Sequence, residues 1–285
     1  MSAGHIVVQG RWLARGLIER VAAVSGATDI RRVDAAAFRL TPMPAARDVA
    51  RRASLRTLCD AARADIAFID RSRPLSAYRL VAMDMDSTLI TIECIDEIAD
   101  LQGIKAEVSA ITAAAMRGEI DYAESLRRRV ALLRGLPVDA LERVYAERLR
   151  LSPGAEGMLA AFRAAGLRTL LVSGGFTFFT ERLRARLGLD YTASNTLGIE
   201  DGRLAGGVEG EIVDAQVKRR TLLETCDLIG CAPDDAIAIG DGANDLAMMG
   251  AAGVSIAYRA KPVVRAGATH AISHNGLDAV PALFD

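Results

Sequence analysis

The sequence predicts an α/β protein, in which helices cover both faces of a parallel sheet. It also predicts a helical insertion after the first strand of that sheet and a small α+β unit in front. From residue 79 onward, short apolar runs alternate with helical stretches, which is typical of parallel sheets. Residues 93–150 lack strand-like runs and are rich in good helix formers. Residues 1–70 follow a β-α-β-β-α-β order, the ferredoxin-like pattern.

Size and composition agree with this organisation. A chain of 285 residues suggests about two domains. With 51% hydrophobic and 25% charged residues it can bury a sizeable core. The net charge of −1 gives no support for a nucleic-acid partner or an anionic membrane surface. The longest uncharged stretch, 246–258, is too short to span a membrane, and the first residues do not resemble a secretory signal.

In the amino-terminal unit we expect strands at 5–9, within 30–40 (two short ones) and at 65–70. Helices are expected at 13–24, ended by Gly26, and at 45–61. This unit is assigned residues 1–70, and the polar segment 71–78 is read as a linker.

The remainder divides into a core of residues 79–92 and 151–285 and a helical cap of residues 93–150. In the core we expect strands at 80–83, 167–172, 236–239, 254–257 and 271–273. One helix should begin with Ser152 as its N-cap and end at Gly166, another should end near Gly188, and a third should span 218–228. Asp201-Gly202 predicts a hairpin turn.

The cysteine and histidine contents exclude several kinds of site. The four cysteines form no CxxC pair, so we expect reduced thiols and a cytoplasmic protein. With only three histidines, a histidine-based triad or a multi-histidine metal site is hard to build. Catalysis must therefore depend on carboxylates, lysine, serine or a hard metal ion.

Acidic residues follow two of the predicted strands directly. Asp84 and Asp86 follow strand 80–83, and Asp241 and Asp245 flank a glycine turn after strand 236–239. Ligands bind beyond the carboxyl ends of parallel strands. If these strands are neighbours, up to four carboxylates converge, which is costly without a cation. Oxygen ligands without histidine favour a hard ion such as Mg²⁺. A single such aspartate more often only caps a helix or makes a turn.

Two further signals are weak when taken alone. Ser173-Gly174-Gly175 follows strand 167–172 and is expected to enter a helix, whose N-terminus can bind an anion such as phosphate. Glycine turns between strand and helix are common, however. Lys218 is either a surface lysine or the positive charge that a phosphate site needs.

Taken in order, these residues resemble the haloacid-dehalogenase-type phosphatases. That family carries DxDx[TV] on its first strand, Ser or Thr after the second, a later lysine and a GDGxND loop. The matches here are DMDST at 84–88, Ser173, Lys218 and GDGAND at 240–245.

The resemblance implies a Rossmann-like haloacid-dehalogenase core with the insertion as its cap. It further implies Asp84 as nucleophile and Asp86 as acid and base. Mg²⁺ would be held by Asp84, the Asp86 backbone carbonyl and Asp241, with Asp245 behind them. Ser173, Gly174, Lys218 and Asn244 would bind the phosphoryl group.

Within that family the sequence is similar to the phosphoserine phosphatases, at 84–97, 125–133, 151–154, 172–176 and 210–218. This implies hydrolysis of the small molecule O-phospho-L-serine to L-serine, the last step of serine biosynthesis. Glu93 would bind the substrate ammonium and Arg129 its carboxylate. Met116 and Tyr122 either line the cap pocket or pack in the cap core. The strand order of the amino-terminal unit is like that of ACT-type regulatory domains, which bind effectors or form homodimers.

Three functions remain open from the sequence. The first is the phosphoserine phosphatase. The second keeps the chemistry but acts on another small phosphomonoester or transfers the phosphoryl group to another hydroxyl. The third is a silent core that binds or senses, with a weaker form in which the amino-terminal unit regulates an active enzyme by binding serine.

Overall fold

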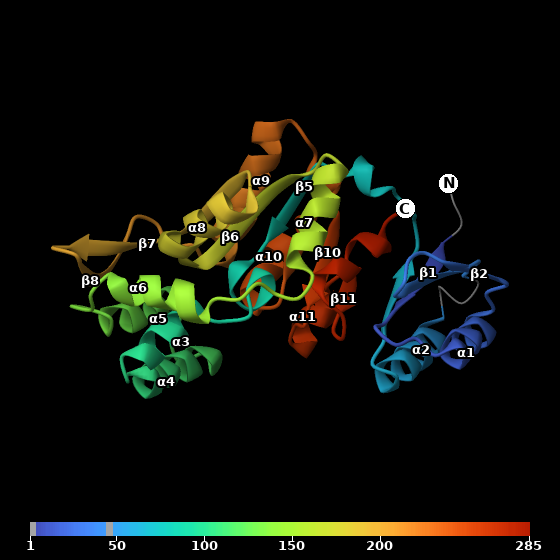
Figure 1. Ribbon diagram of the computed structural model, residues 1–285, viewed down its shortest axis with the longest axis horizontal. Coiled ribbons are helices and arrows are strands. Elements are labelled where there is room, and N and C mark those ends of the chain that lie inside the picture. The colour runs from blue at the N-terminus through green and yellow to red at the C-terminus, as the bar shows by residue number, and fades with distance from the viewer. Residues whose placement is uncertain (1–3, 44–47) are drawn as a thin grey trace.

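The computed structural model describes residues 4–43 and 48–285, which form two sheets with their helices (Figure 1). The smaller sheet is antiparallel and has the order β2-β3-β1-β4. Its strands are β1 (His5–Gln9), β2 (Asp29–Arg32), β3 (Ala37–Thr41) and β4 (Asp65–Ile69), and α1 (Arg15–Ser25) and α2 (Val49–Ala61) cover one face. This is the predicted ferredoxin-like order, and Gly26 ends α1 as expected. Positions 45–47 of the predicted helix 45–61 lie outside the described residues.

The larger sheet has the order β11-β10-β9-β5-β6-β7-β8. All its neighbouring strands are parallel except β7 and β8, which form a hairpin across Asp201 and Gly202, both with positive φ. The strands are β5 (Leu80–Met83), β6 (Arg168–Phe176), β7 (Tyr191–Glu200), β8 (Arg203–Glu209), β9 (Ala236–Gly240), β10 (Val254–Tyr258) and β11 (His270–Ile272). The mostly parallel sheet and the hairpin are both as predicted.

Helices cover both faces of this sheet. They are α7 (Ala155–Ala164), α8 (Thr177–Leu187), α9 (Ala215–Ile229), α10 (Leu246–Met249) and α11 (Pro262–Gly267). Along β5, Val81 and Met83 pack in one apolar cluster with residues of α7 and α8, whereas Leu80 and Ala82 pack in another with residues of α9 and α10. This alternation is what a strand buried on both faces requires.

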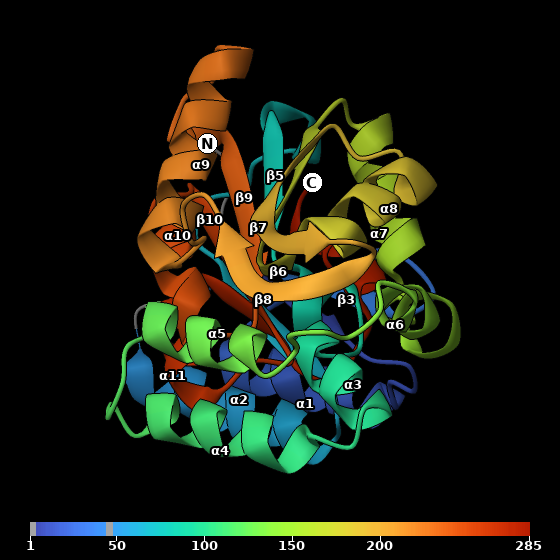
Figure 2. The same ribbon diagram turned by 90° about the vertical axis from the view of Figure 1, so that its left-hand side faces the viewer.

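The segment between β5 and β6 is helical, as predicted. It forms α3 (Cys94–Leu101), α4 (Lys105–Met116), α5 (Tyr122–Ala131) and α6 (Asp139–Arg143). These helices lie beneath the β7–β8 hairpin, at the end of the molecule opposite the amino-terminal unit (Figures 1 and 2). Backbone hydrogen bonds tie the two together, from Gly135 N to Leu204 O and from Leu204 N to Leu136 O, each 2.8 Å long.

Two predicted helix starts are wrong. The helix after the cap begins at Ala155 with Gly154 as N-cap, not at Ser152. Gly154 has a φ of 79°, and Leu277 donates its N–H to the Pro153 carbonyl, so the chain stays non-helical there. Ser173-Gly174-Gly175 does not enter a helix either. It extends β6 to Phe176, and α8 begins at Thr177. The expected helix N-terminus therefore lies beyond these three residues.

The amino-terminal sheet contacts the carboxyl-terminal part of the chain, at residues 273–275. The Asp65 carboxylate accepts hydrogen bonds from the backbone N–H groups of Ser273, His274 and Asn275 at 2.7–3.2 Å. Val7 and Ile69 join the same apolar cluster as residues of the core.

Cys59, Cys94, Cys226 and Cys231 form no disulfide. Among the described residues, every helix is too short or too polar to cross a membrane.

Candidate active site

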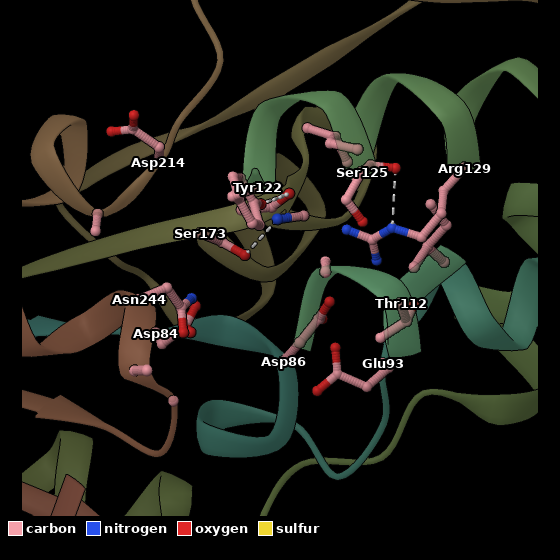
Figure 3. Close-up of a pocket in the computed structure, with 18 of the residues that line it drawn as sticks. Asp84, Asp86, Glu93, Thr112, Tyr122, Ser125, Arg129, Ser173, Asp214 and Asn244 are labelled. Atoms are coloured by element: carbon pink, nitrogen blue, oxygen red, sulfur yellow. Dashed lines mark hydrogen bonds between the residues drawn. The ribbon is translucent and has the colours of Figure 1, made fainter. Parts of the chain in front are cut away.

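Three central strands deliver polar residues to one edge of the larger sheet. In register, Met83 of β5 lies beside Ile239 of β9 on one side and Leu171 of β6 on the other. The next residues therefore emerge side by side, because parallel strands end at the same edge. The neighbour relation on which convergence of the carboxylates depended is confirmed. Asp84, Ser173 and Asn244 lie together on the core side of the cavity (Figure 3).

Lys218 is a fully buried charge of the site. Its side chain is 0% exposed, and its Nζ lies 2.8 Å from Asp84 Oδ2 and 2.8 Å from Asp245 Oδ1. Burial by itself would lower the pKa of Lys218, but the two carboxylates outweigh it and raise that pKa. Lys218 is thus a fixed positive charge next to Asp84 and not a surface lysine. Asp214, as N-cap of α9, fixes the helical turn that carries it.

Asp84 itself is buried and held at both oxygens. Its Oδ1 accepts the Met85 N–H at 2.7 Å, and its Oδ2 pairs with Lys218. Burial and the charge of Asp245 raise the pKa of Asp84, whereas Lys218 opposes the shift.

Three carboxylates lie close enough to share a cation. Asp84, Asp241 and Asp245 each offer one oxygen within 4.8 Å of the other two. The two oxygens of Asp245 are already engaged, one by Lys218 and the other by the N–H groups of Asp241 and Gly242. From the residues that the structure describes, the Asp241 carboxylate accepts only the Thr88 hydroxyl, at 2.9 Å, and burial raises the pKa of Asp241 to about 6. Of the three carboxylates, Asp241 therefore has one oxygen without a partner among the described residues, and Asp245 holds the loop around it.

Asp86 lies in the short turn after β5, on the wall of the cavity. Its Oδ2 accepts the Cys94 N–H at 3.3 Å, and its buried Oδ1 has no partner among the described residues. Burial, together with the charge of Glu93, raises the pKa of Asp86 to about 8. Its carboxyl can therefore carry a proton near neutral pH.

Glu93 and Arg129 face this centre from the cap side (Figure 3). Glu93 accepts the Ser87 hydroxyl at 2.7 Å, and burial raises its pKa. Arg129 donates from Nε to the Ser125 carbonyl at 3.4 Å, within its own helix α5, and it forms no ion pair with any residue that the structure describes. Between cap and core lies a cavity of about 870 Å³. Its lining includes the predicted site residues Asp84, Asp86, Glu93, Arg129, Ser173, Gly174, Asp241 and Asn244.

The cap also reaches the core directly through Tyr122. Its hydroxyl donates to the Gly174 carbonyl at 3.2 Å, and burial raises the pKa of that hydroxyl to about 12. A Cβ on Gly174 would lie 2.1 Å from the same hydroxyl, so only glycine permits this approach. Tyr122 and Met116 both line the cavity, and Tyr122 also packs against the apolar cluster, so both readings hold for Tyr122.

The structure thus brings every predicted site residue to one place. Ser87 and Thr88 belong to the DMDST motif, but no role was assigned to either from the sequence. In the structure their hydroxyls donate to Glu93 and Asp241. Their position directly after Asp86 was the available signal. Ser87 also has a φ of 55°, a conformation that L-residues seldom adopt.

Comparisons with known proteins agree with this geometry. The family described as haloacid dehalogenase-like hydrolase matches residues 78–253. A phosphoserine phosphatase of Polaromonas sp. is 60% identical over 209 residues, which cover 72% of this chain and 89% of the relative. The crystal structure of a probable phosphoserine phosphatase from Vibrio cholerae covers 99% of this chain and 86% of its own, with a TM-score of 0.85 and 38% identity. A substrate-bound phosphoserine phosphatase complex covers 73% of this chain and 99% of its own, with a TM-score of 0.69 and 36% identity.

The family match spans more than half of the chain, and the curated relative is covered over most of its length. The chain therefore belongs to the haloacid dehalogenase-like hydrolases and, within them, to the phosphoserine phosphatases.

Proposed function

We propose that this protein is an Mg²⁺-dependent phosphatase that hydrolyses O-phospho-L-serine to L-serine and phosphate. This reaction would be the last step of serine biosynthesis by the phosphorylated route. The observation that carries the proposal is one cavity with two chemically different walls. The core wall holds Asp84, which is paired with buried Lys218 behind it, and the cap wall holds Glu93 and Arg129. The relatives named phosphoserine phosphatase support the choice of substrate.

Asp84 is the proposed nucleophile. Its carboxylate attacks phosphorus, the bond from phosphorus to the serine oxygen breaks, and an aspartyl-phosphate remains. Asp86 gives its proton to the departing serine oxygen. It then takes a proton from the water that hydrolyses the aspartyl-phosphate, which restores both aspartates. The unpartnered Oδ1 of Asp86 at the cavity wall and its raised pKa agree with this role.

The donor set fits a hard divalent cation. Asp84, the Asp86 backbone carbonyl and Asp241 would hold Mg²⁺, with Asp245 behind them. The ion would supply Lewis-acid stabilisation of the negative charge on the phosphoryl group. The loop from Asp241 to Asp245 is held by its own hydrogen bonds, so both carboxylates stay in place.

The phosphoryl oxygens would be bound by the Ser173 hydroxyl, the Gly174 N–H, Lys218 and Asn244. Fixed donors aimed at a charge that spreads in the transition state lower the barrier without reorganisation. Buried Lys218 and Ser173, which is 1% exposed, have this character.

Specificity is assigned to the cap. Glu93 would bind the substrate ammonium, and the Arg129 guanidinium would bind the carboxylate with two parallel hydrogen bonds. Within the described ranges 4–43 and 48–285 Arg129 has no ion-pair partner, which leaves its guanidinium available for this contact.

The test is phosphate release from O-phospho-L-serine, with Mg²⁺ and with EDTA, beside phosphothreonine, phosphocholine and phosphoglycolate. Asp84→Asn should lower turnover on the order of 10⁴-fold or more, as expected for loss of a nucleophile. Asp201→Asn is the control, because Asp201 is exposed in the hairpin turn and Asn tolerates its positive φ. Unchanged turnover in Asp84→Asn would refute the mechanism. Activity on other esters alone would keep the mechanism and reject the cap assignment.

The proposal includes the division into an ACT-like unit of residues 1–70, a linker of 71–78, a cap of 93–150 and a core formed by the rest. It also includes a cytoplasmic location, supported by four cysteines without a disulfide. Homodimerisation through the amino-terminal unit is supported by β2, an edge strand whose residues are all exposed. Light scattering over a range of concentrations tests the dimer. Equal inhibition by serine with and without residues 1–70 would rule out a serine effector site there.

A further inference from the structure

The strand β6 departs from regular pairing beside the cavity. Val172 pairs with Ala193 and Phe176 pairs with Asn195, so four residue steps on β6 face two on β7. The extra residues bulge out of the ladder, and Ser173, Gly174 and Gly175 lie in the bulge. A bulge of this kind leaves backbone groups without their ladder partners. The Gly174 carbonyl therefore needs another donor.

Asn195 supplies that donor from inside the sheet. Its side chain is fully buried, and its Nδ2 donates to the Gly174 carbonyl at 2.8 Å. Its Oδ1 accepts the Val213 N–H at 2.9 Å. The two partners fix the orientation of the amide, since a flipped amide would set oxygen against oxygen and N–H against N–H. Asn195 thus joins the bulge to the segment that leads into α9.

The hydrogen bond from Asn195 to the Gly174 carbonyl is linked to Ser173 through one peptide unit. The carbonyl belongs to the peptide unit between Gly174 and Gly175, and the N–H of the same unit donates to Ser173 Oγ at 2.9 Å. Because Ser173 Oγ accepts this bond, its hydroxyl hydrogen is free to point at another acceptor. Consecutive hydrogen bonds through one peptide also polarise each other. The series runs from the Asn195 amide through the peptide to the Ser173 hydroxyl.

We propose that Asn195 is a positioning residue that holds the Gly174–Gly175 peptide so that the Ser173 hydroxyl donates to the phosphoryl group of the substrate. This inference rests on the proposed function, in which the Ser173 hydroxyl binds the phosphoryl group. The Tyr122 hydroxyl reaches the same carbonyl at 3.2 Å, but it belongs to the cap. Asn195 is the donor that belongs to the same sheet as Ser173.

The experiment is a double-mutant cycle in the full-length protein. Asn195→Ala, Ser173→Ala and their combination are compared with the wild type for kcat and KM on O-phospho-L-serine with Mg²⁺. Ser194→Ala is the matched control. Ser194 is the preceding residue of β7, and its Oγ lies 2.7 Å from Thr180 Oγ1 of α8, away from the cavity. If Asn195→Ala does not fold, Asn195→Asp keeps the volume and the acceptor for Val213.

We expect Asn195→Ala to lower kcat about 10- to 100-fold, the effect of one or two lost buried hydrogen bonds. KM should change little, because Glu93 and Arg129 still hold the amino-acid end. In the Ser173→Ala background the same substitution should cost less than about 3-fold, because residues that act through one another are not additive. Ser194→Ala should leave kcat and KM unchanged.

A lower melting temperature with kcat unchanged would overturn the proposal, and so would full additivity with Ser173→Ala. Binding of inorganic phosphate, measured by calorimetry, separates this inference from the proposed function. If the wild type binds phosphate but does not hydrolyse phosphoserine, the function fails. The positioning role then stands only if Asn195→Ala weakens phosphate binding when Ser173 is present and has no such effect when Ser173 is already replaced by alanine.

Discussion

The Nζ atom of Lys218 lies 2.8 Å from Oδ2 of Asp84, and the two side chains are 0% and 7% exposed. This pair joins the first turn of α9 to the residue that directly follows β5. Such a pair is costly to break, because the remaining partner is left charged and buried without its counter-charge. It also sets a positive charge next to the atom proposed to attack phosphorus.

Lys218→Met should therefore affect stability and activity together. Loss of the cation leaves Asp84 and Asp245 facing each other, so the free energy of unfolding in EDTA should fall by about 3–5 kcal/mol. kcat/KM should fall about 100- to 1000-fold, as for other donors that stabilise transition-state charge. Urea unfolding and phosphate release measure the two effects.

Lys105→Met is the control for that variant. Lys105 is half exposed on the cap, 3.6 Å from Asp100, and its loss should change the free energy of unfolding by less than about 0.5 kcal/mol. Equal effects of the two substitutions would mean that the buried pair has no special role.

Arg129→Met should change the choice of substrate. Phosphoethanolamine has the phosphate and ammonium of phosphoserine but lacks its carboxylate. We expect kcat/KM for phosphoserine to fall about 10- to 100-fold and that for phosphoethanolamine to stay the same. Arg127→Met, on the exposed face of α5, is the control. A parallel loss on both substrates would assign Arg129 to the phosphate or to the fold.

Asp241→Asn should weaken binding of Mg²⁺ at least about 10-fold, since the carboxylate gives up its charge. Binding to the folded state raises the melting temperature, so added Mg²⁺ should stabilise the wild type more than the variant. Calorimetric titration of the EDTA-treated protein gives the affinity directly. Should the variant keep the wild-type affinity, Asp241 would not be a ligand.

Acid should destabilise the protein through His5, which is buried, and His270, which is partly buried. Burial, reinforced by the Arg39 charge, lowers the pKa of His5 to about 4, and burial also lowers the pKa of His270 to about 4 against the charge of Asp70. Below the ordinary pKa of 6.5 the unfolded chain binds protons that the folded chain does not. Stability is therefore lost as the pH falls from about 6.5 toward 4, by about 1.4 kcal/mol per pH unit and histidine.

His270→Gln isolates part of this effect. The difference in free energy of unfolding between pH 7 and pH 5 should shrink by about 2 kcal/mol in the variant. Urea unfolding at several pH values measures it. An unchanged pH dependence would show that His270 does not contribute.

The strands and their acidic ends could be predicted from the sequence because their signals are local. Strand 80–83 is an apolar run that leads directly into Asp84, and the structure has β5 at those four residues. The hairpin at Asp201-Gly202 depends on residues that accept a positive φ, which is a property of the residues themselves. Ser152-Pro153 failed as a helix start because its partner, Leu277, lies far along the chain.

The sequence by itself determined the order of the elements, the acidic loops and the residue types of the site, since apolar periodicity and turn chemistry act over a few residues. Only the tertiary structure decided that Lys218 is buried between Asp84 and Asp245, and that Tyr122 and Asn195 meet at one carbonyl. These contacts join residues 21–134 positions apart in the chain, so no local pattern encodes them. They form because donors and acceptors that folding buries away from water must hydrogen-bond with each other.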